Sequence, residues 1–153
     1  MRLADLLLKE NIIPELEARD KNGVLEELAG VIAGHDPSLE KNALVKVLLD
    51  RERLGSTGIG EGIAIPHGKF SGISQPIISF GRSRKGLDFE AMDGGLVYLF
   101  FLLVAPENSA SIHLQVLAKI AKILKNIALR EALLEAPGRP ELYQIIVQND
   151  EEF

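Results

Sequence analysis

The stretch from Arg51 to Phe70, RERLGSTGIGEGIAIPHGKF, holds the side chains whose types and spacing could do chemistry. Its glycines loosen the backbone ahead of Ile63 to Ile65, which we expect to form a short strand. The proline before His67 then stiffens the approach, because proline fixes its own φ and extends the residue before it. A stiff imidazole with the hydroxyls of Ser56 and Thr57 nearby in sequence suits presentation to a partner. The alternative is that His67 merely ends a strand.

Arg51 is the second candidate. The helix that we expect to open at Asp36-Pro37-Ser38 has an inward stripe, and Arg51 continues this stripe seven residues after Leu44 and four after Val47. An arginine on a buried helix face must find an anion, a carbonyl or a carboxylate. It either caps carbonyls at the end of the helix or faces the same cleft as the glycine loop and helps to bind an anionic group.

His113 is the third candidate. It lies in the first turn of a helix that we expect to begin near Ser109 or Ser111. Free backbone amides and the positive end of the helix dipole attract an anion such as phosphate there, and they disfavour the imidazolium form. Two imidazoles, a guanidinium and hydroxyls suit phosphoryl transfer with a histidine as nucleophile. The alternative is a histidine that is packed or solvated at a helix start.

Other standard motifs are absent from the sequence or stand in the wrong context. The glycine series Gly58 to Gly62 follows a predicted helix and precedes a predicted strand, the reverse of a dinucleotide fingerprint. No G-x-S-x-G nucleophile elbow occurs. Only three histidines are available for a metal site, and His35 is expected in a surface turn. We therefore expect no metal and no cofactor.

Composition narrows the classes further. A chain of 153 residues fits one domain, expected to span 1–153, and the lack of cysteine excludes disulfides, thiolate nucleophiles and cysteine-bound metals. The net charge of −5 disfavours nucleic-acid binding and anionic membranes. The longest apolar run, Leu96 to Ala105, is far shorter than the ~20 residues that span a bilayer. Asp5 and Lys9-Glu10 argue against a signal peptide, so we expect a cytoplasmic protein with no membrane insertion.

Periodicity and breakers predict an α/β sandwich in which helices flank both faces of a mixed sheet. The predicted strands are an edge strand or extended arm at Asn11 to Leu16, a strand at Pro76 to Gly81, a short one at Leu87 to Phe89 and a central one at Leu96 to Ala105. The predicted helices run from Asp20 to Gly34, from Asp36 past Leu48, from Ser109 or Ser111 towards Asn126, from Ala128 to Glu135 and from Glu141 to Gln148. The remaining segments are a loop at Gly68 to Gln75, a solvated turn at Arg82 to Gly86, a turn at Asp93 to Gly95 and a frayed tail at Asn149 to Phe153.

The Arg-Glu pair followed by the Ala-Ile-Pro-His-Gly core resembles the active-site signature of the fructose–mannitol-type enzyme IIA domain of the bacterial phosphoenolpyruvate-dependent phosphotransferase system. The resemblance covers nearly the whole chain. It includes Phe80 to Ser83, the apolar strand ending in Ala105-Pro106, and His113-Leu114. The segment Glu141 to Ile146 resembles the nitrogen-regulatory branch of this family.

The resemblance implies that His67 accepts a phosphoryl group on Nε2 from the phosphohistidine of HPr, or of an HPr-like carrier, and passes it on. It implies that Arg51 and His113 neutralise and hydrogen-bond the phosphoryl oxygens. Ser56 and Thr57 occupy the family's hydroxyl positions, and Glu61 would help to orient a ring. No nucleotide or metal is required, because the phosphate arrives already attached to a protein.

The lack of cysteine bears on the next acceptor. In the transport branch this acceptor is a cysteine of enzyme IIB, which would have to lie on another molecule. The chain is then either a free-standing transport subunit or a regulator whose phosphorylation state changes its binding to a target protein. We favour the regulatory carrier. Further alternatives are a binding protein that has lost transfer and a metal-dependent hydrolase that uses the two histidines.

Overall fold

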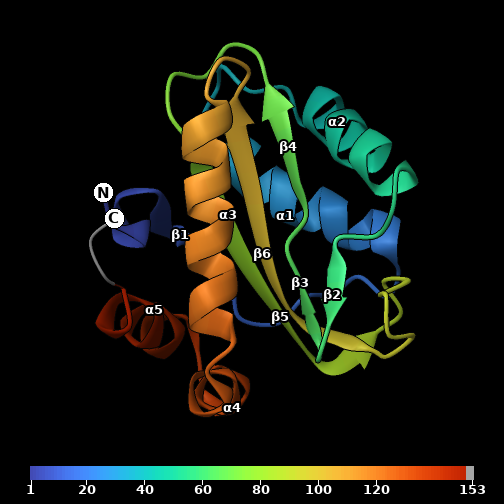
Figure 1. Cartoon of the computed structure of the whole chain (residues 1–153), viewed down its shortest axis with the longest axis vertical. Helices are drawn as coiled ribbons and strands as arrows, with labels where there is room; N and C mark the ends of the chain where they lie inside the picture. Colours follow the sequence, from blue (N-terminus) through green and yellow to red (C-terminus); the bar gives the residue numbers. More distant parts are fainter. Residues whose placement is uncertain (151–153) are drawn as a thin grey trace.

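The computed structural model describes residues 1–150 of the chain, and its framework is a mixed sheet of six strands (Figure 1). The main path runs β1-β5-β6-β3-β2, and β4 also pairs with β6. The strands are β1 (Leu7–Ile13), β2 (Gly58–Gly60), β3 (Ile63–Ala64), β4 (His67–Phe70), β5 (Ile77–Leu87) and β6 (Val97–Pro106). β6 pairs antiparallel with β5 and parallel with β3 and β4, so it is the central strand that its apolar run predicts.

Helices cover both faces of this sheet, which confirms the predicted α/β fold (Figure 1). On one face α1 (Lys21–His35) and α2 (Lys41–Arg53) pack on Phe100, Leu102 and Val104 of β6. The other face holds α3 (Ala110–Leu124), α4 (Ile127–Glu135) and α5 (Arg139–Gln148), whose apolar side chains meet Leu99, Phe101 and Leu103. Alternate residues of one strand therefore belong to two separate cores, as the pleat requires.

Several predicted boundaries agree with the structure. Asp20 caps α1 by accepting a hydrogen bond from the Gly23 N–H at 2.7 Å, and α1 ends at His35. His35 is exposed as expected, although it belongs to the helix and not to a turn. β1 is an edge strand as predicted, but its boundaries differ: it starts at Leu7 instead of Asn11 and ends at Ile13 instead of Leu16, just before Pro14, which cannot donate to a ladder.

The prediction of a solvated turn at Arg82 to Gly86 is wrong, because β5 continues through it to Leu87. Arg82 is only 1% exposed, and its guanidinium finds carbonyl partners. It donates to Pro14 O at 2.9 Å, Leu133 O at 2.7 Å and Ala136 O at 2.6 Å. A buried cation is tolerated when acceptors surround it, and here they come from two separate segments, Pro14 after β1 and the C-terminal end of α4.

Other boundaries also move. α2 begins at Lys41, capped by Glu40, because Asp36 instead forms a turn by accepting from the N–H and hydroxyl of Ser38. Part of the expected loop at Gly68 to Gln75 is β4, and Asp88 and Phe89 lie outside any strand. The described part of the tail is ordered, since buried Asp150 accepts from the N–H groups of Leu3 and Ala4, both at 2.9 Å. Residues 151–153 of the predicted frayed tail lie outside the described part.

α3 is less buried than its sequence suggests. His113, Val116, Ile120 and Ile123 face inward, whereas Leu114 is 67% exposed. Within residues 1–150, every helix falls short of the length and apolar content needed to cross a membrane.

Candidate functional site

Elements from both faces of the sheet meet at one edge strand. β4 pairs with β6 and leaves its other side to α2, while the first turn of α3 approaches from the opposite face (Figure 1). An open hollow of about 530 Å³ lies where the three elements meet. Its lining residues are Val47, Asp50, Arg51, Leu54, His67, Gly68, Lys69, Ala110, His113, Leu114 and Leu117. The structure thus brings together Arg51, His67 and His113, which lie far apart in sequence.

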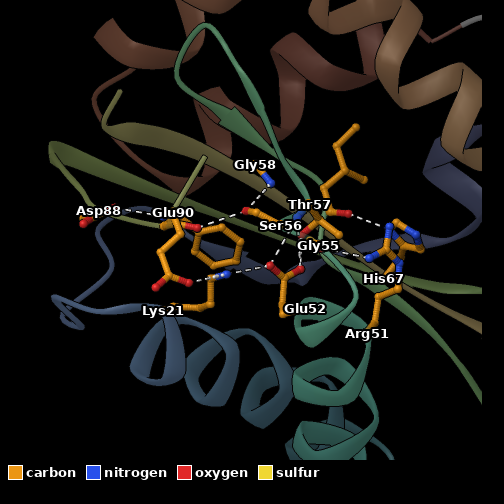
Figure 2. Close-up of polar contacts among 12 residues, drawn as sticks. Lys21, Arg51, Glu52, Gly55, Ser56, Thr57, Gly58, His67, Asp88 and Glu90 are labelled. Atoms are coloured by element: carbon orange, nitrogen blue, oxygen red, sulfur yellow. Dashed lines mark hydrogen bonds and ion pairs between the residues drawn. The ribbon is translucent and has the colours of Figure 1, made fainter. Parts of the chain in front are cut away.

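The hydrogen bond of the His67 ring identifies its free nitrogen. Nδ1 lies 2.7 Å from the Ile65 carbonyl oxygen, and a carbonyl can only accept, so Nδ1 carries the proton (Figure 2). In the neutral ring Nε2 therefore keeps its lone pair. The half-buried ring lines the hollow, so this lone pair is available to an electrophile brought by a partner.

His113 stands edge-on to His67. The ring centroids are 5.4 Å apart and the planes meet at 85°. His113 is 7% exposed, and its buried Nδ1 has no hydrogen-bond partner within the described residues. α3 starts without a side-chain cap, because the Ser109 hydroxyl donates to Pro106 O at 2.7 Å instead. An acceptor entering the hollow would meet this ring beside the uncapped end of the helix.

Arg51 combines the two roles that its sequence position suggests. Its Nη1 donates to Gly55 O at 2.9 Å, just beyond the end of α2, while the side chain lines the hollow next to His67 (Figure 2). No carboxylate in residues 1–150 forms an ion pair with this guanidinium. Asp50, the acidic residue of the lining, instead pairs with Arg53 at 2.8 Å and Lys46 at 3.2 Å.

Both imidazoles are biased towards the neutral form. Burial lowers the pKa of His67 below 6.5, and Arg51 lowers it further, although the Ile65 hydrogen bond and Glu52 oppose this. Burial also lowers the pKa of His113 below 6.5, with smaller contributions from His67 and Lys69. A ring must be neutral to act as a nucleophile, so the site is prepared for that chemistry near pH 7.

The structure places Ser56, Thr57 and Glu61 outside the lining of the hollow. The Ser56 hydroxyl donates to Phe89 O at 3.0 Å and accepts from the Gly58 N–H. The Thr57 hydroxyl is buried and donates to the carboxylate of Glu52. Glu61 is exposed at a φ of 58°, and its carboxylate lies 3.5 Å from the guanidinium of Arg130. These contacts favour supporting roles for all three side chains.

Sequence reasoning assigned no individual role to three residues beside this site, although Glu52 and Gly68 belong to the family signature. Lys69 follows His67 by two residues in β4 and therefore shares its face of the strand, a signal that alternation could have given. Gly68 lets β4 approach α2, because a Cβ there would lie 2.7 Å from Val47 Cγ1. Glu52 is a buried carboxylate one residue after Arg51 and is 7% exposed. Residues 1–150 contain no cluster of three or more histidine and acidic side chains able to hold a metal.

Known proteins are similar to this chain in sequence and in fold. Residues 5–149 match the family described as phosphoenolpyruvate-dependent sugar phosphotransferase system, EIIA 2. A nitrogen regulatory protein of Pseudomonas aeruginosa is 37% identical over 147 residues, which are 96% of this chain and 96% of that protein. The fructose-specific EIIABC component of Bacillus subtilis is 37% identical over 98% of this chain, but the chain spans only 24% of that protein.

Among solved structures, the nitrogen regulatory protein IIA-Ntr of Neisseria meningitidis superposes with a TM-score of 0.88 at 35% identity, covering 94% of this chain and 98% of that one. The fold and the histidine-centred hollow define a phosphotransferase component built as an α/β sandwich. The chain belongs to the EIIA 2 family of the phosphoenolpyruvate-dependent sugar phosphotransferase system, as its signature predicted.

Proposed function

We propose that His67 is the phosphoryl-accepting residue of this chain and that the donor is the phosphohistidine of HPr or of an HPr-like carrier. The observation that carries the proposal is the hydrogen bond from His67 Nδ1 to Ile65 O at 2.7 Å, which leaves Nε2 as the nucleophile on the ring that lines the hollow. The chain would do this as a single EIIA domain in the cytoplasm.

The transfer balances with the groups present. The Nε2 lone pair forms a bond to phosphorus while the nitrogen–phosphorus bond of the carrier breaks, and the carrier ring leaves with that electron pair. The proton stays on Nδ1 and is donated in a hydrogen bond to the Ile65 carbonyl, which stabilises the positive charge of the phosphorylated ring. Because the Nδ1 proton keeps that ring cationic, the new bond is labile and the phosphoryl group can be passed on.

Charge stabilisation would come from Arg51 and His113. In the transition state of the transfer, negative charge is spread over the phosphoryl oxygens. Catalysis then consists mostly of aligning the reacting groups and neutralising this charge. Arg51 has no ion-pair partner in the described chain, and the His113 ring lines the same hollow edge-on to His67, so both would stand beside the transferred group. Lys69 adds a second positive charge to the lining.

The test is phosphorylation with phosphoenolpyruvate, enzyme I and HPr. The unmodified chain should take up one acid-labile phosphate, and His67→Ala should take up none. His113→Ala serves as the matched control, since it should be phosphorylated slowly but on the same residue. Label that persists on His67→Ala and disappears from His113→Ala would overturn the assignment.

The next step depends on the branch. The match to the Pseudomonas protein along 96% of both chains supports a nitrogen-regulatory role, in which the phosphorylation state would control binding to a target protein. The equal identity to the fructose-specific Bacillus protein supports the alternative, transfer to the cysteine of a separate enzyme IIB. Incubating the phosphorylated chain with an enzyme IIB would separate these, because only the transport role predicts loss of the label to that cysteine. Normal partner binding without any phosphate uptake would favour a binding protein that has lost transfer.

A further inference from the structure

Glu52 is a buried carboxylate that the transfer itself does not use. It follows Arg51 in the last turn of α2, but its side chain points away from the hollow and its side-chain exposure is 4% (Figure 2). The ammonium group of Lys21, at the start of α1, lies 3.0 Å from Oε1. A buried charge needs such partners, because unpaired it would be very costly.

Within residues 1–150, the remaining hydrogen-bond donors to the Glu52 carboxylate all belong to Thr57. The Thr57 N–H lies 3.2 Å from Oε1 and 3.3 Å from Oε2, and the Thr57 hydroxyl donates to Oε2. Glu52 therefore closes the loop that joins α2 to β2. Inside this loop Gly55, at a φ of 146°, presents the carbonyl that receives the Arg51 guanidinium. By holding this loop, Glu52 also holds the Gly55 carbonyl in the position where it accepts from the Arg51 guanidinium.

The same carboxylate is linked to His67 through one further residue. The carbonyl of Thr57 accepts from the Ile65 N–H at 3.0 Å, and the carbonyl of Ile65 accepts from His67 Nδ1 at 2.7 Å. Thr57 and Ile65 are 3% and 5% exposed, so neither bond is readily replaced by water. Both catalytic side chains are therefore held by carbonyls whose positions depend on the contact between Glu52 and Thr57.

We propose that Glu52 is a positioning residue for phosphoryl transfer: through Thr57 it places the Ile65 carbonyl that keeps His67 in its Nδ1–H tautomer and the Gly55 carbonyl that holds Arg51. The rate consequence rests on the proposed function of His67, whereas the tautomer consequence does not. The role differs from that of a general core anchor, because it predicts which ring nitrogen carries the proton.

The experiment uses Glu52→Gln in the full chain. Glutamine keeps the shape but replaces one of the two carboxylate oxygens with an NH2 group, so either Lys21 or the Thr57 hydroxyl would face a donor instead of an acceptor. Nitrogen-15 NMR of the His67 ring should show the Nε2–H tautomer gaining population. The rate of phosphorylation by phosphorylated HPr should fall roughly tenfold, as expected when a charge-assisted hydrogen bond is weakened.

Glu90→Gln is the matched control. Glu90 also pairs with Lys21 at 3.0 Å, but its side chain is 75% exposed and, within residues 1–150, forms no hydrogen bond or ion pair with residues 54–57. The control should keep the tautomer and the rate of the parent chain. If Glu52→Gln does not fold, Thr57→Val makes the same test by removing the hydroxyl, and Thr57→Ser should restore the parent tautomer.

The outcomes separate the two proposals. A parent chain that takes up no phosphate would overturn the proposed function. The His67 tautomer of Glu52→Gln, compared with that of the parent chain, would still test the role of Glu52. Folded Glu52→Gln with an unchanged tautomer would overturn the positioning role, whatever its rate. A tautomer shift of equal size in Glu90→Gln would also overturn it, because the effect would then come from charge around Lys21.

Discussion

At the scale of single residues, the candidate site is characterised by the protonation of its two histidine rings. The Ile65 carbonyl holds the His67 proton on Nδ1, and burial keeps both imidazoles neutral. Each ring has a pKa below 6.5 in the folded chain, so around pH 6.5 the folded state binds fewer protons than the unfolded state. The neutral rings that the proposed phosphoryl transfer needs therefore lower the free energy of unfolding in acid.

The pH dependence of stability tests this relation. The free energy of unfolding should be flat above the unfolded pKa of about 6.5 and should fall as the pH drops from there to the folded pKa values. Urea titrations at about pH 7.5 and pH 5.5 would measure the slope. The double variant His67→Gln, His113→Gln replaces both rings with neutral side chains, so it should lose less stability over the same interval. A steeper loss in the double variant would contradict the lowered pKa values.

The Arg51 guanidinium makes a second prediction at this scale. Arg51→Ala should slow phosphoryl transfer on the order of 10²-fold, because one preorganised charged donor is lost from the transition state. Its fold should persist, since the side chain is only half-buried and its hydrogen bond goes to the exposed residue Gly55. Rapid-quench phosphorylation and thermal melting would measure both effects.

Arg53→Ala is the control for Arg51→Ala. Arg53 ends the same helix but is exposed and paired with Asp50, so the variant should transfer at the parent rate. Wholesale unfolding of Arg51→Ala, with transfer unchanged in the fraction that stays folded, would instead assign Arg51 to capping alone.

Residue types and spacing predict three of the side chains that line the hollow, but not Lys69 and not the contacts that support the site. His67, Arg51 and His113 come from strong local signals, namely a proline-histidine-glycine motif, a helix stripe and a helix start. The direction of the Ser56 and Thr57 hydroxyls is set by Phe89 O and by Glu52. Phe89 is far from Ser56 in the sequence, and the helical pattern around Glu52 does not show where its side chain points. The prediction that these hydroxyls bind phosphate therefore rests on the sequence alone, and in the structure both hydroxyls donate to partners within the chain.

At the scale of elements, the site exists because β4 is an edge strand that lies close to α2. Gly68 makes this contact possible, and a Cβ at this position would come within 2.7 Å of Val47 Cγ1. Valine is stiff at χ1, so its methyl group cannot easily turn aside. The distance between Arg51 on α2 and His67 on β4 therefore depends on a residue that has no side chain.

Gly68→Ala should push α2 away from β4. We expect a loss of stability of about 1–3 kcal/mol from overpacking, together with slower phosphorylation as Arg51 recedes from His67. Chemical denaturation and transfer rates would measure the two effects. Adding Val47→Ala makes room for the new methyl group, so the double variant should lose less than the sum of the two single changes. Strict additivity would show that the contact does not set the spacing.

The lengths of elements are predicted well where local patterns decide them and poorly where distant partners do. The apolar run of β6 and the cap at Asp20 are local, and both agree with the structure. The end of β5 is not local, because charged Arg82 belongs to the strand only through carbonyls of Pro14, Leu133 and Ala136. From sequence alone, the run of positive charges from Arg82 to Lys85 indicates a solvated turn, because nothing nearby in the sequence shows that carbonyl acceptors await Arg82.

At the scale of the whole molecule, charge and apolar surface are distributed unevenly. The chain carries a net charge of −5, yet the hollow presents Arg51 and Lys69, and its acidic residue Asp50 is already paired. Leu54, just after α2, and Leu114, in α3, line the hollow and are 85% and 67% exposed. Large exposed apolar side chains beside a reactive group are typical of a docking surface for a protein partner.

We therefore expect Leu54 and Leu114 to set the affinity for the carrier and not the rate of the transfer step. The double variant Leu54→Ala, Leu114→Ala should raise KM for phosphorylated HPr roughly tenfold, equivalent to about 1.4 kcal/mol, with kcat preserved. Both side chains are exposed, so thermal stability should hardly change. Met92→Ala is the control, because Met92 is 80% exposed but absent from the lining of the hollow. A fall in kcat at constant KM would place these leucines in the transfer step, and an equal effect of Met92→Ala would move the docking surface elsewhere.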